Sequence, residues 1–380
     1  MKLLCYCPFS NGGIVDYADA QAAALADCGL DLTVLTTGRQ STAPVGRFSV
    51  AGLRDESGRL DSRSRTIRQI RRSQLICDNI GVLKDRLLTS GIRHVLFASF
   101  SEYAAPLWSR QLKAVARSGI RFGAMLHDPV RNYVAGPEWW HRRSVRAGYS
   151  FLSEAFVHEP VDRAEAGIPD HVRVTLVPHG PLDFPQPVES GADLRKRFGI
   201  PEHVRLLLSF GQIRDGKNLS MAIEAIKEFA DVWLLVAGSE AGGMNRPVKY
   251  YQELAKSQGV GARCRWFTEF VPADKVGSYF LAADLVLLVY SRAFRSASGV
   301  LNAAVQFRKP CLASSGQSAL RTQVERYRLG VWVEPDDPAA IREGLCHWLR
   351  GLPEPVWSEY LGENSWSRNA ESVVQRMFFS

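Results

Sequence analysis

The chain has 380 residues, of which 46% are hydrophobic and 23% are charged, and its formal net charge is +8. This length exceeds a single compact core and fits two domains, and the composition is typical of a soluble globular protein. No apolar run is long enough to span a bilayer, and Pro8 interrupts the first apolar run too early for a secretory signal. The seven cysteines have no zinc or disulfide spacing. We therefore expect a cytoplasmic protein that holds no metal and no cofactor.

Short apolar runs alternate with amphipathic stretches along the whole chain. In the first half the runs predict strands at residues 2–7, 31–36, 94–98, 121–126, 155–157 and 173–177. In the second half they predict strands at residues 204–210, 232–237, 264–267, 285–288, 310–313 and 330–333. Such alternation is typical of parallel sheets with helices on both faces. The sequence therefore predicts an α/β protein with two doubly wound, Rossmann-like domains.

A proline-rich segment separates the two series of strands. Four prolines lie within residues 178–187, a density that marks a linker or a hinge. We place the first domain at residues 1–180 and the second at residues 181–364, followed by a helical segment at 365–380. Ligands of doubly wound sheets bind at the carboxyl ends of the strands. Two such domains are expected to face each other across a central cleft.

Two groups of arginines carry much of the positive charge. The first group consists of Arg63, Arg65, Arg68, Arg71 and Arg72, and the second of Arg142, Arg143 and Arg146. Nucleic acid, anionic lipid and a phosphorylated substrate would each suit this charge, but we find no nucleic-acid-binding motif. Because Trp139 and Trp140 precede the second group, we expect peripheral contact with an anionic membrane at its cytoplasmic face. The alternative is that these arginines simply lie on solvated faces of helices.

The loop after the predicted strand 204–210 carries two cations in front of an expected helix. Gly211 ends the strand, and Arg214 and Lys217 lie three residues apart. A helix start offers free N–H groups and a positive dipole end, and full charges strengthen its attraction for anions. The loop therefore fits a phosphate-bearing ligand, although an ordinary solvated loop is also often basic.

Paired glycines follow the first predicted strand. Gly12 and Gly13, preceded by Asn11, open the first long helix. Without a Cβ, their backbone N–H groups can approach a phosphate closely. The spacing is not that of a dinucleotide-binding fingerprint, and no acidic residue ends the second strand to hold a ribose. A tight turn that requires positive φ is the alternative explanation.

Histidines end several strands of the first domain. His127 and Asp128 follow the strand 121–126, where a histidine and a carboxylate can bind a sugar hydroxyl or exchange a proton. His158 has a similar position, and His179 at the hinge suits a structural cap. A structural role is the alternative for each of these side chains.

Small residues start a helix after the strand 285–288. Ser298, Gly299 and Val300 can form a second nest for an oxyanion, although Ser298 as a simple N-cap explains the pattern equally well. No serine nucleophile elbow, Walker loop or H-E-x-x-H site is present. The sequence therefore indicates anion binding and does not indicate a hydrolase of those classes.

Nearly the whole chain resembles a nucleotide-sugar-dependent glycosyltransferase of the GT-B fold, close to glycosyltransferase family 4. The likeness rests on the glycine-rich first loop, on residues 102–106 and 120–129, on the arginine–lysine loop, and on residues 236–239, 270–272, 279–283 and 298–311. It implies transfer with retention and without a metal, an acceptor-binding first domain, a donor-binding second domain, and a final helix that crosses back onto the first domain. By resemblance, His127, Arg214 and Lys217 are catalytic. Donor contacts are implied for Gly12, Gly13, Gly211, Gly238, Phe270, Val271, Ser298, Gly299 and Val300.

The chain departs from the family at its paired glutamates. The two positions, eight residues apart and counted back from Pro310, are occupied by Arg295 and Ala303. In the family these glutamates contact the donor sugar and the ribose hydroxyls. Asn302 is the nearest polar substitute for the ribose contact. Because a guanidinium only donates hydrogen bonds, we expect Arg295 to meet a carboxylate or a further phosphate of the donor or acceptor, or else to point to solvent.

We predict a glycosyltransferase that moves a sugar from a nucleoside diphosphate to a hydroxyl of a glycan or a lipid-linked acceptor, in polysaccharide or glycolipid assembly. The fixed cations would stabilise the charge that the leaving diphosphate gains in the transition state. A nucleotide-sugar epimerase of the same architecture and a catalytically inactive binding module are the two alternatives. The missing glutamates favour the inactive module, whereas the intact arginine–lysine loop argues against it.

Overall fold

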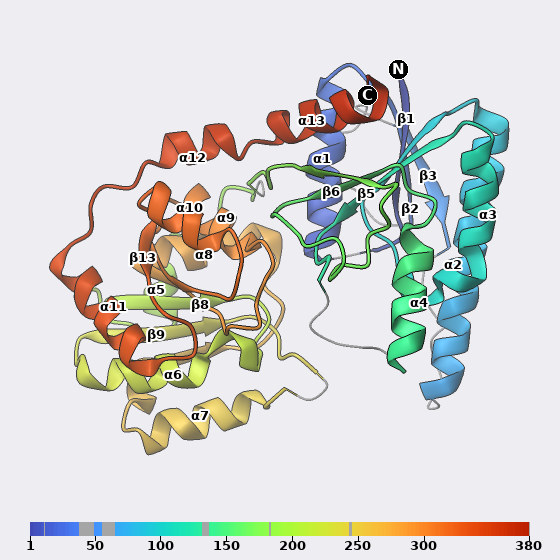
Figure 1. Ribbon diagram of the computed structural model, residues 1–380. Coiled ribbons are helices and arrows are strands. Elements are labelled where there is room, and N and C mark those ends of the chain that lie inside the picture. The colour runs from blue at the N-terminus through green and yellow to red at the C-terminus, as the bar shows by residue number, and fades with distance from the viewer. Residues whose placement is uncertain are drawn as a thin grey trace. The chain divides into compact units, whose positions relative to one another are not determined.

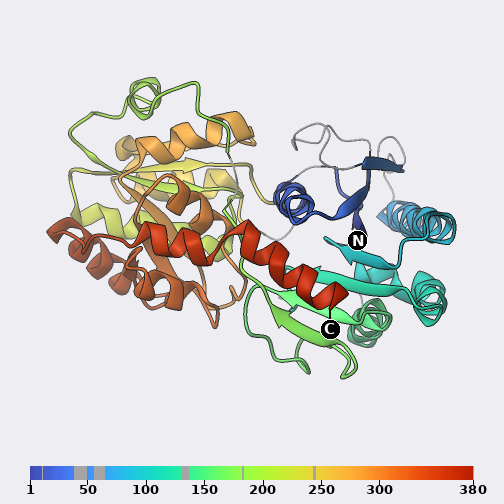
Figure 2. The ribbon, with the colours of Figure 1, turned by 90° about the horizontal axis from the view of Figure 1, so that it is seen from above.

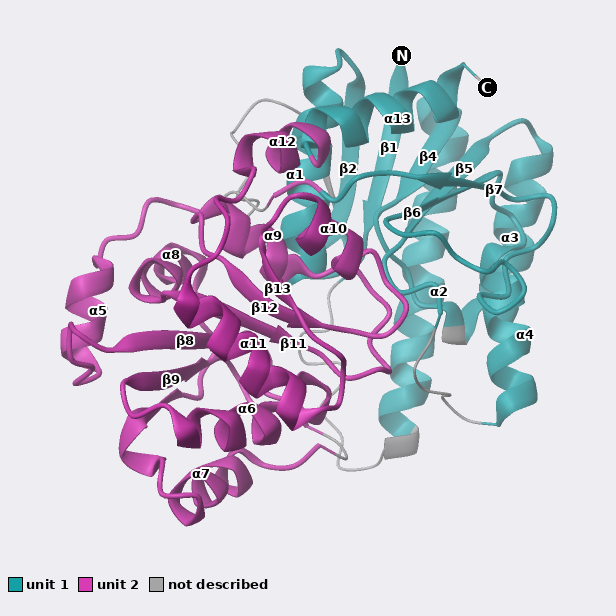
Figure 3. Cartoon of the chain, turned by 60° about the vertical axis from the view of Figure 1, so that its left-hand side comes forward, with its two compact units in different colours: residues 1–179, 365–380 teal, residues 180–364 magenta. Residues whose placement is uncertain are grey.

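A computed structural model describes residues 1–10, 12–37, 49–54, 65–130, 137–181, 184–242 and 245–379, so that Asn11 and Arg63 lie outside the described part. The chain divides into two compact units (Figure 3). Unit 1 comprises Met1–His179 and Ser365–Ser380, and unit 2 comprises Gly180–Asn364. Each unit is a parallel sheet with helices on both faces, as Figure 1 shows. This confirms the predicted doubly wound α/β architecture.

The sheet of unit 1 has seven strands in the order β3-β2-β1-β4-β5-β6-β7, all parallel. Their bounds are β1 (Lys2–Cys7), β2 (Asp31–Thr37), β3 (Ser49–Leu53), β4 (His94–Phe97), β5 (Arg121–Leu126), β6 (Glu154–Val157) and β7 (Arg173–Leu176). The six predicted strands are confirmed. Strand β3 was missed because its short Ser-Val-Ala-Gly-Leu sequence has little strand character of its own. It forms at the edge of the sheet through its pairing with β2.

Helices cover both faces of this sheet. They are α1 (Gly13–Asp27), α2 (Arg65–Ser90), η1 (Glu102–Ala104), α3 (Ala105–Arg117), α4 (Glu138–Tyr149) and α13 (Trp366–Phe378). Helices α2, α3 and α4 pack on one face, around the fully buried Trp108. Helices α1 and α13 pack on the other face, as Figures 1 and 2 show. None of the helices in the described ranges is both long and apolar enough to cross a membrane.

The last helix lies directly against the sheet of unit 1, although it is far from that unit in sequence. A Cβ built on Gly123 of β5 would lie 2.7 Å from the Met377 Sδ, so a larger residue at this position would force the Met377 side chain to move. Met377 and Val373 are fully buried beside Met125 and Phe156. Burial of this apolar stripe holds α13 on unit 1, because a helix of 13 residues is marginal by itself.

The sheet of unit 2 has six strands in the order β10-β9-β8-β11-β12-β13, all parallel. The bounds are β8 (Arg205–Phe210), β9 (Val232–Ala237), β10 (Cys264–Phe267), β11 (Leu285–Val289), β12 (Cys311–Ser314) and β13 (Gly330–Trp332). All six were predicted and are confirmed. Alternate residues of the central strands enter two separate apolar cores, one on each face of the sheet. Both faces are therefore covered, and the carboxyl ends of the strands carry the loops considered below.

The helices of unit 2 divide between these two cores. Those in the described chain are α5 (Gly191–Arg197), η2 (Asp215–Lys217), α6 (Leu219–Ala225), η3 (Ile226–Glu228), α7 (Val248–Ser257), η4 (Gly261–Arg263), α8 (Ala273–Ala282), α9 (Gly299–Gln306), α10 (Leu320–Arg326), α11 (Pro338–Arg350) and α12 (Trp357–Glu363). Helices α6, α7 and α11 pack on one face, and α5, α8, α9, α10 and α12 on the other. The loop with the two predicted cations forms η2 and leads into α6.

Candidate functional site

The ends of β8 and β9 meet at two glycines. Gly211 donates its N–H to the Ala237 carbonyl at 2.8 Å. A Cβ at Gly238 would lie only 2.3 Å from the Gly211 carbonyl oxygen, and both glycines have positive φ, 86° and 146°. Only glycine fits this crossing of two backbones. The crossing fixes the start of residues 210–218, which we call the phosphate loop because of the ligand predicted for it.

Lys217 turns back onto the start of the phosphate loop. Its Nζ donates to the Phe210 carbonyl, and a Cβ at Gly211 would lie 3.3 Å from the same Nζ. Desolvation, with added repulsion from Arg214, lowers the pKa of Lys217 to about 7. The structure therefore holds an ammonium group whose charge is costly unless an anion is present.

The second cation lies beside an aromatic ring. The Arg214 guanidinium carbon is 6.0 Å from the centre of the Phe294 ring, at the limit of a cation–π contact. Within the described residues the side chains of Arg214 and Lys217 form no salt bridge with any carboxylate. Two neighbouring cations without an acidic partner make a site for an anionic ligand.

The one acidic residue between these cations is engaged elsewhere. Asp215 accepts from the Tyr251 hydroxyl at 2.5 Å and from the Arg246 Nε at 3.1 Å. Burial opposes ionisation of Asp215, but these hydrogen bonds outweigh it and lower its pKa. The carboxylate thus anchors the loop to α7 and its preceding segment, and it leaves the charge of Arg214 and Lys217 uncompensated. Sequence reasoning gave Asp215 no role.

Asp336 holds the other side of the phosphate loop. It accepts from the Asn218 Nδ2 at 2.9 Å and from the backbone N–H of Arg292 at 2.9 Å. The Ser291 N–H donates to the Gly216 carbonyl at 3.0 Å. These bonds tie the loop after β8 to the loop after β11. Asn218 and Asp336 both adopt left-handed backbone conformations. Asp336 was not predicted from the sequence, because it lies 118 positions from its partner Asn218.

The start of α9 lies next to the same glycine. The Ser298 Oγ accepts from the Leu301 N–H at 3.2 Å and is 2.9 Å from the hydroxyl of the buried Tyr290. Ser298 is therefore an N-cap, as the simpler explanation had it. A Cβ at Gly211 would be 4.0 Å from the Val300 Cγ2. The first turn of α9, with Gly299 and Val300, thus converges with Lys217 on Gly211.

Two predicted donor contacts have side chains that point into the protein interior. Asn302 is 3% exposed, and its amide oxygen accepts from the Tyr360 hydroxyl of α12 at 2.7 Å. This arrangement argues against Asn302 as the substitute for the missing ribose-binding glutamate. Val271 is 7% exposed and belongs to an apolar core, so only its backbone is available to a ligand. Phe270, by contrast, is 69% exposed.

Arg295 lines a basic cavity of about 470 Å³ at the carboxyl ends of β12 and β13. Arg292 and Arg321 line the same cavity, together with Ser315, Ser318 and Thr322. Arg321 is paired with Glu325 at 3.0 Å, and Glu334 is the one acidic side chain among the lining residues. The lining thus has excess positive charge and several hydroxyl donors. The cavity has the chemistry that suits a phosphate or a carboxylate.

In unit 1 the predicted glycine loop precedes α1. Gly12 is the N-cap with φ 93°, and its carbonyl accepts from the N–H groups of Val15 at 2.8 Å and Asp16 at 3.3 Å. Gly13 is exposed at the first position of the helix. Both explanations offered for this loop are therefore compatible with its geometry. A positive-φ turn is present, and the N-cap Gly12 offers the first N–H groups of α1 no side-chain acceptor, as the N-terminus of a helix that binds an anion requires.

Three histidines at the ends of β5, β6 and β7 surround one tyrosine. The Tyr17 ring lies 4.7, 5.2 and 5.1 Å from the rings of His127, His158 and His179, respectively. Trp366 of α13 completes the group at 4.8 Å from Tyr17. We call these three imidazoles the histidine cluster. The sequence placed His127 and His158 at strand ends and His179 at the hinge, but it did not show that the three share one partner on α1.

Backbone carbonyls orient two of these imidazoles. The Nε2 of His127 lies 2.9 Å from the Ala98 carbonyl, and the Nδ1 of His158 lies 3.1 Å from the Val177 carbonyl, so each of these nitrogens carries a proton. Burial, with repulsion from His179 and His127, lowers the pKa of His158 well below its ordinary value. In the described parts of the chain, no group of histidine, cysteine or acidic side chains is arranged to hold a metal ion. Asp128 is exposed beside His127.

An amide network joins the histidine cluster to the last helix. The Asn369 Nδ2 donates to the Tyr17 hydroxyl at 2.9 Å and to the Pro178 carbonyl at 2.7 Å. Its Oδ1 accepts from the Gln21 Nε2 at 2.8 Å. Asn369 is fully buried, so these bonds are costly to lose. The network fixes α13 on α1 and on the end of the segment that follows β7.

The comparisons with known proteins agree with this architecture. Residues 191–356 match the family described as "Glycosyl transferases group 1". No curated protein sequence matches the chain. Three solved structures are similar over the whole of this chain and 95% or more of their own. Sucrose-phosphate synthase from Thermosynechococcus elongatus is 16% identical, with a TM-score of 0.67 over 100% of this chain and 95% of that chain. WaaG, a glycosyltransferase involved in lipopolysaccharide biosynthesis, is 17% identical, with a TM-score of 0.64 over 100% of both chains. HepE of Anabaena, in complex with UDP and glucose, is 14% identical, with a TM-score of 0.65 over 100% of this chain and 95% of that chain.

At such low identities the similarity to solved structures concerns the fold. Its extent over the entire chain confirms the two Rossmann-like sheets expected of the GT-B fold. The family match lies within unit 2 and covers the phosphate loop, the crossing at Gly238 and the start of α9. The chain therefore has the GT-B fold, and residues 191–356 of unit 2 match the group 1 glycosyl transferases.

Proposed function

We propose that the protein transfers a sugar, with retention of anomeric configuration, from a nucleoside diphosphate to a hydroxyl acceptor. One observation carries this proposal: Arg214 and Lys217 lie together at the end of β8, without a carboxylate partner among the described residues. The donor diphosphate supplies the missing negative charge. The first turn of α9, at Gly299 and Val300, adds backbone N–H groups on the same side of Gly211.

The transferred sugar leaves the diphosphate in a step that this site favours. The bond between the anomeric carbon and the phosphate oxygen breaks, and that oxygen gains negative charge. A bond forms between the anomeric carbon and the acceptor oxygen, and the acceptor proton passes to the departing phosphate oxygen. Lys217 and Arg214 stabilise the charge on the diphosphate as it develops. No separate general base is required on this route.

The state of Lys217 supports a diphosphate rather than a neutral ligand at this site. In the free protein the pKa of Lys217 is lowered to about 7 by desolvation and by Arg214. A nearby diphosphate reverses the second effect, because an opposite charge favours the ammonium form. Donor binding therefore draws a proton onto Lys217 when the pH is above about 7.

The basic cavity beside Arg295 supports a finer proposal about specificity. Because Arg292, Arg295 and Arg321 line it, we propose that it receives an anionic substituent of the donor or the acceptor, such as a carboxylate or a further phosphate. Binding of this anionic substituent by Arg295 would replace the contact that a glutamate makes with the donor sugar in the family pattern. Arg295→Ala should then raise the KM for an anionic substrate and leave the KM for a neutral analogue unchanged.

The acceptor and its setting are also proposals. The similarity of the fold to WaaG, a glycosyltransferase of lipopolysaccharide biosynthesis, supports a glycan or a lipid-linked acceptor. We propose that unit 1 binds it, with His127 and Asp128 as hydroxyl ligands at the end of β5. Exposed Ile70 and Trp139, 53% and 67% exposed, accompany the arginines of α2 and α4 and support contact with an anionic membrane.

Hydrolysis of nucleotide sugars in the absence of an acceptor tests the reaction class. UDP-glucose is the first donor to try, because the similar HepE structure contains UDP and glucose. A transferase slowly releases free sugar and nucleoside diphosphate. An epimerase instead interconverts sugars, and a protein that binds donors but gives neither result is a binding module. The absence of both reactions across UDP, GDP, ADP and dTDP sugars would overturn the proposal.

A further inference from the structure

Unit 2 has a second cavity, of about 420 Å³, at the opposite edge of its sheet from the phosphate loop. Arg205 is the first residue of β8, Asp284 precedes β11, and Pro310 precedes β12, so the amino ends of three strands form its floor. The phosphate loop begins at the last residue of β8. Five residue steps of an extended strand separate the two edges by roughly 16 Å. The cavity is therefore distinct from the donor site.

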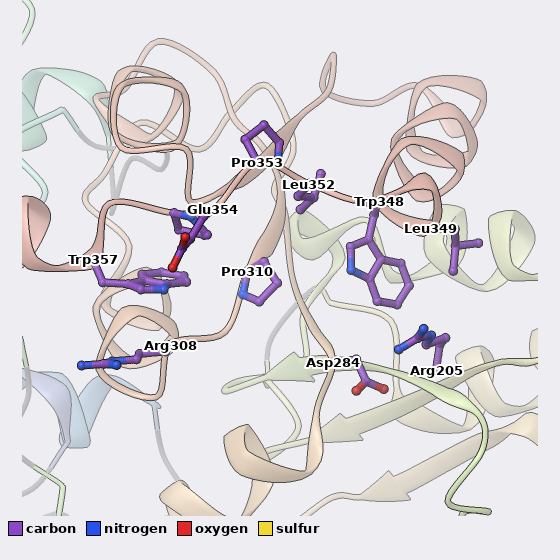
Figure 4. Close-up of a pocket in the computed structure, with 12 residues that line it drawn as sticks. Arg205, Asp284, Arg308, Pro310, Trp348, Leu349, Leu352, Pro353, Glu354 and Trp357 are labelled. Atoms are coloured by element: carbon purple, nitrogen blue, oxygen red, sulfur yellow. The ribbon is translucent and has the colours of Figure 1, made fainter.

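Two tryptophans form opposite sides of this cavity. Trp348 lies near the end of α11, and Trp357 is the first residue of α12 (Figure 4). Each is partly buried and packs against a different apolar core of unit 2, so the position of each indole is fixed. Each also contributes to the cavity lining. Rigid aromatic surfaces in a cavity of this volume are typical of a small-molecule site.

Four charged side chains line the cavity around these indoles. In the described residues, the side chains of Arg205, Arg308 and Glu354 form neither a hydrogen bond nor a salt bridge. Asp284 accepts from the Arg195 Nη2 and the Leu206 N–H, both at 2.7 Å, and both bonds go to its Oδ2. Its Oδ1 remains an acceptor. In Figure 4 Arg205 and Asp284 lie near Trp348, while Glu354 and Arg308 lie near Trp357.

The chemistry of the lining selects among ligand classes. Two guanidinium groups and two carboxylates line the cavity, and although Asp284 is also paired with Arg195, the lining offers acceptors as well as donors. The basic cavity beside Arg295 has three arginines and one carboxylate and favours an anion more strongly. Paired donors and acceptors fit a ligand that carries many hydroxyl groups, because each hydroxyl both donates and accepts. The flat C–H face of a pyranose is apolar and stacks on an indole. A proline-rich peptide would also stack on tryptophan, but its few polar groups would leave these charged side chains unpaired.

We propose that this cavity is a second, non-catalytic carbohydrate-binding site, which holds a neutral glycan segment between Trp348 and Trp357. The four charged groups hydrogen-bond its hydroxyls from the floor and the rim. The site acts independently of donor binding because it lies at the opposite edge of the sheet. It retains a glycan on unit 2 whether or not the phosphate loop is occupied.

Titration with neutral oligosaccharides tests this site. Maltohexaose, cellohexaose and isomaltohexaose would be added to the full-length protein, with binding followed by isothermal calorimetry and by saturation-transfer NMR. We expect at least one to bind, and Trp357→Ala to weaken its Kd by about tenfold or more, as truncation of an aromatic anchor does. Trp139→Ala, at an exposed tryptophan of α4 in unit 1, serves as the matched control and should have no effect.

Two further variants keep the outcome interpretable. Glu354→Gln and Arg308→Gln change exposed side chains that belong to no apolar core, so they test the site even where a tryptophan variant fails to fold. Each should weaken the same oligosaccharide severalfold, and Lys217→Ala should leave its Kd unchanged. The proposal is overturned if none of the three oligosaccharides binds, if the cavity variants bind as tightly as the wild type, if Lys217→Ala abolishes binding, or if only a proline-rich peptide binds.

Discussion

The phosphate loop of unit 2 and the histidine cluster of unit 1 both consist of polar residues at the ends of parallel strands, yet their environments differ. Arg214 and Lys217 have no carboxylate partner in the described residues, whereas Asp215 between them is bound by Tyr251 and Arg246. The imidazoles of the cluster instead pack on Tyr17, and backbone carbonyls orient His127 and His158. A strand-end position alone therefore does not identify a catalytic residue. An uncompensated charge is the more informative sign of a ligand site.

The two regions also respond to ionisation in different ways. Lys217 is held where its charge is costly and where an anionic ligand removes that cost. His158 is also held where its charge is costly, but the rings next to it in the described residues are two imidazoles and a phenol, none of which is negative. A ligand can thus restore the charged form of Lys217, whereas protonation of His158 strains the fold. The predictions below test this difference.

The largest effect is expected from removing the cations of the phosphate loop. Lys217→Ala and Arg214→Ala should each lower turnover by roughly 10²–10³-fold, by analogy with the loss of an oxyanion-hole donor. Folding should be little changed, because neither cation is paired with a carboxylate of the described residues. Lys256→Ala, at an exposed lysine of α7, is the matched control. Steady-state kinetics with a hydrolysable donor measure the effect, and wild-type turnover in both loop variants would remove the claim that this loop is the donor site.

The next effect concerns the backbone crossing that positions the loop. Gly238→Ala brings a Cβ to 2.3 Å from the Gly211 carbonyl at a φ of 146°, so the strand ends must separate. Strain of this kind costs about 1–3 kcal/mol, and the displaced Gly211 should also weaken donor binding. Gly242→Ala is the control, because a Cβ there meets nothing within 4 Å. Chemical denaturation measures the loss of stability, and donor titration measures the loss of affinity. If Gly238→Ala and Gly242→Ala are equally stable, the crossing is not rigid.

The pKa of Lys217 makes donor affinity depend on pH. Above about pH 7 the free protein has lost the Lys217 proton, so binding of UDP-glucose must take one up, and the Kd should rise steadily between pH 7 and 9. Calorimetry in buffers of different ionisation enthalpy would detect the proton uptake. Lys217→Arg, which stays charged throughout this range, should flatten the profile. A wild-type affinity that does not change over this range would contradict a lowered pKa.

The histidine cluster should make unit 1 sensitive to acid. The folded-state pKa of His158 lies below its unfolded value of about 6.5, so the unfolded state binds the proton more readily. The stability that this group contributes is fully present above about pH 6.5 and is lost as the pH falls below it. His158→Gln, which does not ionise, should reduce the loss. Hydrogen exchange of the α13 amides, corrected for intrinsic rates, should be faster in the wild type at pH 5 than at pH 7.5. If the exchange rates of wild type and His158→Gln depend on pH in the same way, His158 is excluded as the cause.

The smallest effect is expected at the arginine-rich helices of unit 1. Each cation near an anionic bilayer contributes about 1 kcal/mol, so Arg68→Glu and Arg71→Glu in α2 should reduce co-sedimentation with phosphatidylserine vesicles at low salt. Arg117→Glu at the end of α3 is the control within the same unit. Salt should release the wild type. Binding that is absent at low ionic strength would favour a soluble acceptor.

The local pattern of residues was sufficient to predict most of the fold. Apolar runs bounded by turn residues predicted twelve strands, and the structure confirms them. Strand β3 could not be predicted, because hydrogen bonds to β2 rather than its own side chains define it. The phosphate loop was also visible in the sequence, since Gly211, Arg214 and Lys217 are close along the chain and one loop brings them together.

Tertiary structure decided everything that depends on distant partners. Asp336 and Asn218, Asn369 and Tyr17, and Asn302 and Tyr360 are hydrogen-bonded pairs separated by 118, 352 and 58 positions. No local pattern reveals such pairs, because the spacing between them depends on how the sheets are assembled. The same holds for the histidine cluster. The sequence by itself thus determined which loops carry charge, and only the packed structure decided which charges are neutralised and which remain for a ligand.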